Sequence, residues 1–199
     1  MLNEGFKNRV ELLEFINEKF PNGIGVEIGV AGGHFTQQIV KSWKTCHKLF
    51  AVDLWEHQDE GYNDGCNLSN DVQLERYNQV LKDFSKHKHV SFLKMWSHIA
   101  VNQFYDNHVD FIYLDANHSY QGCMNDLNIW YPKIKKGGIF AGHDYSSGVD
   151  DSYNVKKAVD EFTASKGIKL FHTLDQNSPE RAFYGAGWEG HSFYFEKQE

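Results

Sequence analysis

The hydrophobic positions of the chain change their spacing in a regular way from one segment to the next. Near the start, apolar residues from Phe6 to Phe20 recur at helical spacing, and Pro21-Asn22-Gly23 ends the run. Short apolar runs, typical of buried strands, then alternate with amphipathic helical segments. The predicted strands are 24–30, 49–53, 89–95, 110–115, 139–144, 168–173 and 191–197, and the predicted helices after the first are 34–43, 71–85, 99–104, 120–130 and 155–162.

This alternation is typical of βαβ units, so we predict one α/β domain over residues 1–199 with a largely parallel sheet and helices on both faces. An N-terminal helix falls within residues 1–22, and HSFYFEK alternates like an antiparallel edge strand. Residues 54–70 have no periodicity and are rich in Asp, Asn and Gly, which predicts a loop. Its acidic part, Glu56 to Asp64, fits a lid over a substrate and a solvated loop equally well.

Composition narrows the class of protein. The net charge is −7, the pI is near 5.9, and the densest basic run is Lys133 to Lys136, so a nucleic-acid partner is disfavoured. The three cysteines form no CxxC pair, which favours a reducing compartment. No apolar run approaches the length of a membrane span, and the first residues contain no leader-like apolar segment. We therefore expect a cytoplasmic protein without a membrane partner.

Acidic residues recur where the predicted strands end. In an open parallel sheet, ligands bind outside the carboxyl ends of the strands. Five strand ends are candidates for a ligand site, and four of them carry an acid. Turn residues such as Ser, Asn or Gly would be expected at these positions instead. These ends are Glu27 to Gly33, Asp53, Trp96-Ser97, Asp115 to His118, and His143-Asp144.

The segment VEIGVAGG joins a predicted strand to a predicted helix. Glycines permit a tight turn and close approach of a ligand to the backbone, and the next helix offers its N-terminus. The dinucleotide fingerprint G-x-G-x-x-G is not met, because Ala31 stands two positions after Gly29. A ligand without a pyrophosphate does not need that glycine, and Glu27 suits a ligand with a positive charge or hydroxyls. A plain strand–turn–helix connection explains the segment equally well.

Asp53 ends the second predicted strand, about twenty residues beyond the glycine loop. An acid at this position can bind both hydroxyls of a ribose through charge-assisted hydrogen bonds. The alternative is that Asp53 caps the segment that follows it. Of the two interpretations we favour ribose binding.

The stretch YLDANHSY places an acid and a histidine after a buried strand. Asp115 ends the fourth strand and His143-Asp144 the fifth, and adjacent strands lie about 5 Å apart, so these side chains can converge. Two carboxylates and an imidazole would repel or shift their pKa values without a cation, which predicts Mg²⁺, with Mn²⁺ as the other candidate. His118 is then the predicted general base. Alternatively, His118 only caps a helix that starts near Ser119.

The segments VEIGVAGGHFT, FAVD, FIYLDANHSY, WYPKIKKGGIFAGHDY and VKKAVDEF occur in this order over residues 24–162. In this order they resemble the class I S-adenosylmethionine-dependent methyltransferases, and among them the macrolide sugar O-methyltransferases such as the macrocin and mycinamicin enzymes. The resemblance implies a Rossmann-like, doubly wound, seven-stranded sheet of order 3-2-1-4-5-7-6 with strand 7 antiparallel. It also implies transfer of a methyl group to a small-molecule hydroxyl, with a sugar among the candidate acceptors.

The same resemblance implies roles for the residues at the strand ends. Glu27 and the glycines would hold the methionine end of S-adenosylmethionine, Asp53 its ribose, and Ser97 its adenine side. The expected cofactor residues are Glu27, Gly29, Gly32, Gly33, Asp53, Leu54 and Ser97. In metal-dependent relatives, the residues matched by Asp115 and by His143-Asp144 bind Mg²⁺, and the residue matched by His118 is the general base, so Asp115 and His118 form the expected catalytic pair. This chain departs from the pattern at His143, where those relatives carry an acid.

Other functions share parts of this pattern. A nicotinamide-dependent oxidoreductase would use Asp53, but its glycine fingerprint is absent. A non-catalytic nucleotide-binding module would not need Asp115, His118 and Asp144 together. A metal-dependent hydroxylase or hydrolase on the same fold would not explain Glu27 and Asp53. The sequence does not specify the acceptor, and it is compatible with a homo-oligomer.

Overall fold

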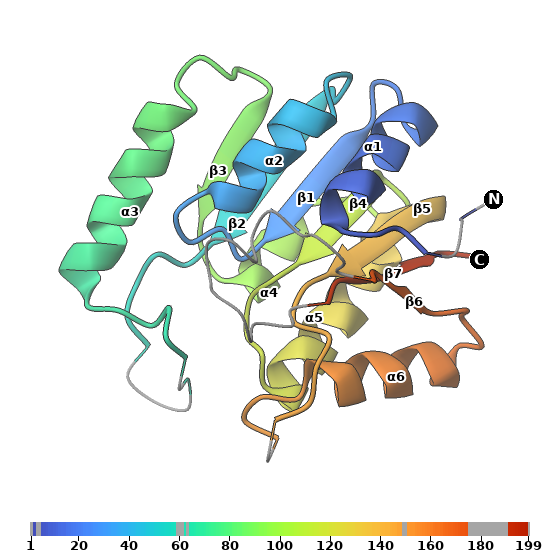
Figure 1. Ribbon diagram of the computed structural model, residues 1–199. Helices are drawn as coiled ribbons and strands as arrows, with labels where there is room; N and C mark the ends of the chain where they lie inside the picture. Colours follow the sequence, from blue (N-terminus) through green and yellow to red (C-terminus); the bar gives the residue numbers. More distant parts are fainter. Residues whose placement is uncertain are drawn as a thin grey trace.

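The computed structural model describes residues 2, 5–58, 62, 64–148, 151–174 and 191–198, and a seven-stranded sheet forms its centre. The strands follow the order β3-β2-β1-β4-β5-β7-β6 across the sheet (Figure 1). Strand β7 is antiparallel to both of its neighbours, and the other pairs are parallel, so the predicted order and the antiparallel strand are confirmed. The strands are β1 Ile24–Ile28, β2 Lys48–Asp53, β3 Val90–Lys94, β4 Val109–Leu114, β5 Ile134–Gly142, β6 Phe171–His172 and β7 Phe193–Glu196.

Helices cover both faces of the sheet, as the alternating pattern predicts (Figure 1). Side chains of β1 alternate between the faces: Val26 and Ile28 pack in the cluster that contains α5 and α6, whereas Glu27 points toward α1 and α2. The helices on the Glu27 face are α1 Arg9–Lys19, α2 His34–Ser42 and α3 Asn70–Asp83. The helices on the other face are α4 Ser97–Ala100, α5 Tyr120–Trp130 and α6 Val155–Ser165, with the short 3-10 turns η1 Val101–Gln103 and η2 Tyr131–Lys133.

The strand register brings the predicted site residues to one edge. Ile28 pairs with Leu114, and Leu114 pairs with Gly142, so β1, β4 and β5 end side by side. Backbone hydrogen bonds continue for one step beyond the strands, from Asp115 N–H to the Ile28 carbonyl and from His143 N–H to the Leu114 carbonyl. Because the strand order reverses between β1 and β4, this edge is the crevice where open α/β sheets bind ligands.

Two predicted strands differ from the observed ones by three or more residues at one end. Strand β5 begins at Ile134 rather than Ile139, and it passes through Gly137, whose φ of 74° accommodates a shift of register against β4. Strand β6 contains only Phe171 and His172 of the predicted 168–173, because it pairs with β7 alone at the edge of the sheet. Neither difference moves the residues at the carboxyl ends of β1, β2 and β4.

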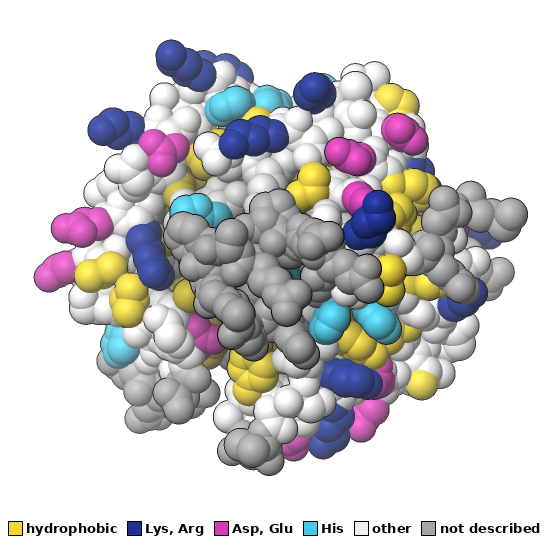
Figure 2. Space-filling model, in the orientation of Figure 1, with side chains coloured by type: hydrophobic (Ala, Val, Ile, Leu, Met, Phe, Trp, Pro, Cys, Tyr) yellow, Lys and Arg dark blue, Asp and Glu magenta, His cyan; other side chains and the backbone are white. Residues whose placement is uncertain are grey.

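The visible surface carries charges of both signs (Figure 2), in agreement with the mixed acidic and basic composition of the sequence. Figure 2 shows basic and acidic side chains interspersed on the visible face. Within the described ranges, none of the helices combines the length and apolar character that a membrane span requires.

Candidate active site

A cavity of about 800 Å³ opens at the carboxyl ends of the central strands. Its lining includes every predicted site residue except Gly33: Glu27, Gly29, Gly32, Asp53, Leu54, Ser97, Asp115, His118, His143 and Asp144. Gly33 precedes α2 with a φ of 78°, and a Cβ there would lie 3.0 Å from Val80 and 3.1 Å from Phe84. The absence of a side chain at Gly33 thus serves the packing of α2 against α3, and its contact with the cofactor stays a prediction.

The glycine-loop side of the cavity, formed by residues 27–33 and 53–55, is organised by backbone groups. The Asp53 Oδ2 atom accepts hydrogen bonds from the N–H groups of Val30 and Ala31, both at 2.8 Å, and Oδ1 accepts one from Trp55 at 2.9 Å. A carboxylate offers about four acceptor positions, so three of them already hold the loop. The predicted binding of two ribose hydroxyls by Asp53 would have to share this carboxylate with the backbone.

Gly29 connects this loop to the neighbouring strand end. Its φ is 88°, and a Cβ built on it would lie 1.8 Å from the carbonyl oxygen of Asp115. Only a residue without a side chain allows the loop to lie against β4 in this way. The glycine loop and Asp115 thus belong to one cavity because of Gly29.

Glu27 is the buried acid of the glycine-loop side. Its side chain accepts a hydrogen bond of 2.6 Å from the Thr36 hydroxyl on α2, and the residue is 1% exposed. Burial raises the pKa of Glu27 to about 8, with the Thr36 hydrogen bond acting in the opposite direction. A carboxyl group with this pKa is mostly neutral at pH 7, although the charge of Arg9 acts to lower the pKa.

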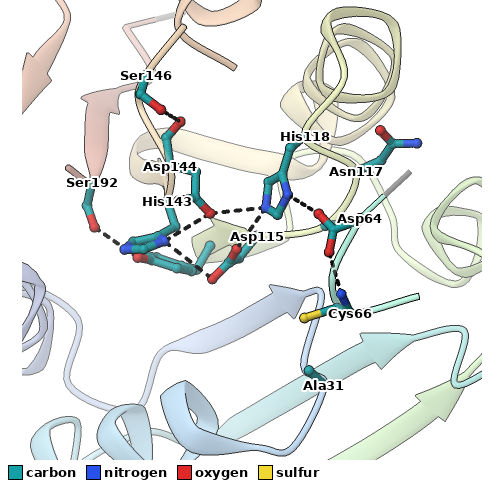
Figure 3. A network of polar contacts seen from close by, with 12 residues as sticks. Ala31, Asp64, Cys66, Asp115, Asn117, His118, His143, Asp144, Ser146 and Ser192 are labelled. Carbon is teal, nitrogen blue, oxygen red and sulfur yellow. Dashed lines mark hydrogen bonds and ion pairs between the residues drawn. The ribbon is translucent and has the colours of Figure 1, made fainter. Parts of the chain in front are cut away.

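Five residues form an acid–histidine cluster on the other side of the cavity: Asp64, Asp115, His118, His143 and Asp144 (Figure 3). The imidazole of His118 lies between the carboxylates. Its Nδ1 atom is 2.7 Å from Asp64 Oδ2, and its Nε2 atom is 3.1 Å from Asp144 Oδ2 and 3.4 Å from Asp115 Oδ1. Residues from three separate segments of the chain thus converge on one ring.

Electrostatics in the cluster follows from this geometry. Burial opposes the charged imidazole, but hydrogen bonds to Asp115, Asp144 and Asp64 raise the pKa of His118 far above its usual range. The hydrogen bond from His118 lowers the pKa of Asp64. Burial opposes ionisation of Asp144, but hydrogen bonds from His118 and His143 hold its pKa well below the ordinary value. The cluster therefore contains a protonated His118 that compensates its carboxylates.

The two predicted carboxylate ligands of a metal ion, Asp115 and Asp144, lie close together. Ligand atoms of Asp115, His118 and Asp144 lie within 4.8 Å of one another, a donor set that could hold a metal ion. His143 is 3.2 Å from Asp144 Oδ2 through its Nδ1 atom, but 3.9 Å from Asp115 Oδ2. His118 is the histidine whose ring lies nearest to both carboxylates, and metal binding by His143 stays a prediction.

Residues 26–145 of the chain match the model of a family described as a methyltransferase domain. The chain belongs to this methyltransferase family. An uncharacterized protein of Acanthamoeba polyphaga mimivirus is 38% identical over 39 residues, a stretch that covers 20% of this chain and 18% of that protein. The match therefore spans about a fifth of the length of the curated relative.

Solved structures share the fold of this methyltransferase domain at low identity. An O-methyltransferase from Bacillus cereus in complex with SAH has a TM-score of 0.66 and 12% identity, with 95% of this chain and 80% of that chain covered. A SAM-dependent O-methyltransferase from Thermotoga maritima has a TM-score of 0.60 and 12% identity, covering 96% and 65%. The fibrillarin pre-rRNA processing protein of Methanococcus jannaschii has a TM-score of 0.59 and 11% identity, covering 89% and 67%. These similarities establish the fold alone.

Two residues of the methyltransferase site were missed by the sequence analysis. Arg9, at the start of α1, is 7% exposed and lines the cavity; its Nη1 atom donates to the Tyr113 hydroxyl and lies 4.0 Å from Asp115 Oδ2. Its guanidinium lies 4.4 Å from the ring centroid of Phe35. Asp64 is the other. Neither residue follows a predicted strand, so strand-end reasoning did not single them out, although Asp64 closes the acidic segment from Glu56 that the sequence offered as a possible lid.

The structure resolves whether His118 caps α5. The N-cap is Ser119, whose hydroxyl accepts a hydrogen bond of 3.0 Å from Gly122 N–H, while Asn117 Oδ1 accepts from Ser119 N–H. Both ring nitrogens of His118 face carboxylates instead. The capping alternative for His118 is therefore wrong.

Ser97 belongs to a third part of the cavity wall. Its hydroxyl oxygen lies 2.5 Å from Asp126 Oδ1 and accepts a hydrogen bond of 2.7 Å from the Trp130 indole. Burial raises the pKa of Asp126 to about 6. The Ser97 hydroxyl is thus fixed by two residues of α5.

Proposed function

We propose that this methyltransferase transfers the methyl group of S-adenosylmethionine to a hydroxyl oxygen of a small molecule, with a divalent metal ion at Asp115 and Asp144. The observation that carries the proposal is that one cavity joins the glycine-loop side to the acid–histidine cluster. Membership of the methyltransferase family supports the cofactor, as does the SAH complex of the Bacillus cereus O-methyltransferase.

The cofactor would lie along the glycine-loop side. Glu27 is buried and neutral in the free protein, and it becomes a carboxylate partner when a positively charged group enters beside it. Gly29 and Gly32 allow close approach of the ligand to the backbone. Asp53 and Leu54 would contact the ribose, and Ser97 the adenine side.

The donor set of the acid–histidine cluster fits a divalent ion. The two carboxylates suit Mg²⁺ or Mn²⁺, and the ligand atoms of Asp115 and Asp144 lie within 4.8 Å of one another, close enough to share one ion. A bound divalent cation would lower the pKa of an acceptor hydroxyl and neutralise the carboxylates. Asp115 and Asp144 are the carboxylates that would hold it, and the Nδ1 atom of His143 lies 3.2 Å from Asp144 Oδ2.

His118 would act on the acceptor as the general base. Its raised pKa in the free protein depends in part on Asp115 and Asp144, so a cation held by these carboxylates would lower this pKa and leave Nε2 able to accept the proton of the hydroxyl. The sulfonium group of the cofactor is already an activated electrophile, and the remaining task of the protein is to align donor and acceptor.

A polyol, with a sugar as the favoured class, is the acceptor that we propose. Beside the cluster, the cavity wall contains the side chains of Tyr62, Asn117 and Tyr153, which provide hydrogen-bonding groups next to aromatic surfaces. Such a wall suits a neutral ligand with several hydroxyls. We further propose that the segment 54–70 contributes to substrate binding, since Tyr62 and Asp64 belong to this wall.

Calorimetry with S-adenosylhomocysteine (SAH) and with NAD tests the cofactor. We expect SAH to bind and NAD not to bind. NAD binding without SAH binding would overturn the proposal in favour of an oxidoreductase. Binding of SAH with no methyl transfer from labelled S-adenosylmethionine to any sugar or catechol, in the presence of Mg²⁺ or Mn²⁺, would favour a non-catalytic module instead.

A further inference from the structure

Asp64 is the nearest charged partner of His118, although it lies 54 residues earlier in the sequence. The Nδ1–Oδ2 distance of 2.7 Å is shorter than both distances from Nε2 to the other carboxylates, 3.1 Å and 3.4 Å. Figure 3 shows Asp64 on one side of the ring, with Asp115 and Asp144 on the other. The two ring nitrogens therefore face two different sets of acids.

The carboxylate of Asp64 is itself held in place. Its Oδ1 atom accepts a hydrogen bond of 2.7 Å from Cys66 N–H, and its side chain is 14% exposed. Cys66 is in turn fixed to α3, because its carbonyl accepts a hydrogen bond of 2.8 Å from the Gln73 side-chain amide. One oxygen of Asp64 thus serves the local backbone, and the other is directed to His118.

We propose that Asp64 is a positioning residue of the site: it accepts the Nδ1–H of His118 and so directs Nε2 toward Asp115 and Asp144. A carboxylate on one imidazole nitrogen fixes the tautomer and the orientation of the ring. The consequence for catalysis rests on the proposed function, because only there does Nε2 act on an acceptor beside a cation. The segment between β2 and α3 then supplies a functional side chain to a site built at the ends of β4 and β5.

A purely local role for Asp64 is the competing explanation. Aspartate followed two residues later by a hydrogen-bonded N–H is a common turn arrangement, and the Cys66 contact alone would satisfy it. That role requires only Oδ1. The two explanations differ in whether the state of the His118 ring changes when Asp64 is replaced.

Nuclear magnetic resonance of the full chain with ¹⁵N-labelled histidine distinguishes them. Two-bond ¹H–¹⁵N correlations identify which ring nitrogen carries a proton, and His118→Gln assigns the signals. In the wild type, with and without Mg²⁺, we expect a downfield, exchange-protected proton on Nδ1. Asp64→Ala should lose this resonance, and Asp64→Asn should shift it upfield, because an amide oxygen is a weaker acceptor than a carboxylate.

Asp71→Asn is the matched control, since Asp71 is an exposed aspartate in the first turn of α3 and, unlike Asp64, does not line the cavity. It should leave the His118 signals unchanged. If Asp64→Ala does not fold, the near-isosteric Asp64→Asn variant still decides the question. An unchanged Nδ1 resonance in a folded Asp64 variant, or a wild-type ring protonated on Nε2 alone, would overturn the proposal. Failure of SAH to bind would instead count against the proposed function, because the histidine spectra do not depend on the cofactor.

Discussion

The two sides of the cavity are held in place by different kinds of interaction. On the glycine-loop side, a side chain contacts the backbone. Asp53 accepts hydrogen bonds from three backbone N–H groups, two of which lie 22 and 23 residues away in the chain. In the acid–histidine cluster, side chains contact other side chains, and His118 interacts with Asp64 across 54 residues. The first side is therefore a property of one βαβ unit, whereas the second requires the whole fold.

The two sides also differ in how they handle charge. Burial keeps Glu27 neutral, so the glycine-loop side contains an acid that would ionise beside a cationic ligand. The cluster instead contains several ionised carboxylates that surround one imidazole, and its charges compensate one another. We therefore expect cofactor affinity and methyl transfer to respond to different substitutions.

Removal of divalent ions should have the largest effect on turnover. An ion at Asp115 and Asp144 would stabilise the transition state by several kcal/mol, so chelation should lower methyl transfer by about 10³-fold or more. The SAH affinity should hardly change, because the glycine-loop side has its own contacts. Labelled methyl transfer and calorimetry in excess chelator, before and after added Mg²⁺ or Mn²⁺, measure the two effects separately. Undiminished activity in chelator would remove the metal from the mechanism.

Replacement of His118 should come next in magnitude. His118→Ala should lower kcat by about 10²–10⁴-fold, the usual range for a general base. Calorimetry should give an SAH affinity close to that of the wild type. Because His118 also compensates buried carboxylates, the comparison should be made in saturating Mg²⁺ and per folded molecule. A fully active His118→Ala protein would mean that the imidazole serves only the charge balance.

The sequence predicted the glycine-loop side more completely than the cluster for a physical reason. Strand register forces Gly29, Asp115 and His143 to one edge, so residues at strand ends could be located from the apolar pattern alone. Arg9 and Asp64 enter the site through helix packing and loop geometry, which local patterns do not encode. That His118 lies closer to Asp115 than His143 does likewise depends on side-chain direction, which strand spacing leaves open.

The substitution Glu27→Gln should raise the stability of the protein above about pH 5 but weaken its binding of SAH. In the unfolded chain the carboxyl ionises near pH 4.5, but in the folded protein only near pH 8, so the folded state binds more protons between these values. Wild-type stability should therefore fall as pH rises from about 4.5 to 8, and the variant should lack this loss. Above pH 8 the free energy of unfolding of the variant should exceed that of the wild type by a few kcal/mol, since one pKa unit corresponds to about 1.4 kcal/mol.

The same variant should bind SAH more weakly, because glutamine cannot ionise beside a cationic group. Urea unfolding at several pH values and calorimetry at pH 7 measure the two properties. A pH dependence of stability equal in wild type and variant would show that Glu27 does not titrate in this range. Thr36→Val is a useful comparison, since it removes the hydrogen bond to Glu27 and leaves the carboxyl in place.

Asp53→Ala should have a smaller effect on both properties. Loss of a charged acceptor should weaken SAH binding by about 1.5–3 kcal/mol. The variant also leaves the N–H groups of Val30 and Ala31 without their acceptor, so the melting temperature should fall as well. Asp53→Asn keeps one side-chain oxygen, so its SAH affinity and its melting temperature should lie between those of the wild type and Asp53→Ala. An Asp53→Ala protein with lower stability but unchanged SAH affinity would restrict Asp53 to holding the loop.

The smallest expected effect belongs to Ser119, the neighbour of His118. Because its hydroxyl accepts the Gly122 N–H at the start of α5, Ser119→Ala should lower the free energy of unfolding by about 0.5–2 kcal/mol. Turnover per folded molecule should remain near that of the wild type, since the hydroxyl contacts the backbone of α5 rather than the acid–histidine cluster. Adjacent residues should thus give opposite results, with Ser119 affecting stability and His118 affecting turnover. Urea unfolding and single-turnover rates on both variants measure this. A Ser119→Ala protein of normal stability and reduced turnover would mean that the start of α5 sets the orientation of His118, and the ring would then depend on its helix more than on Asp64.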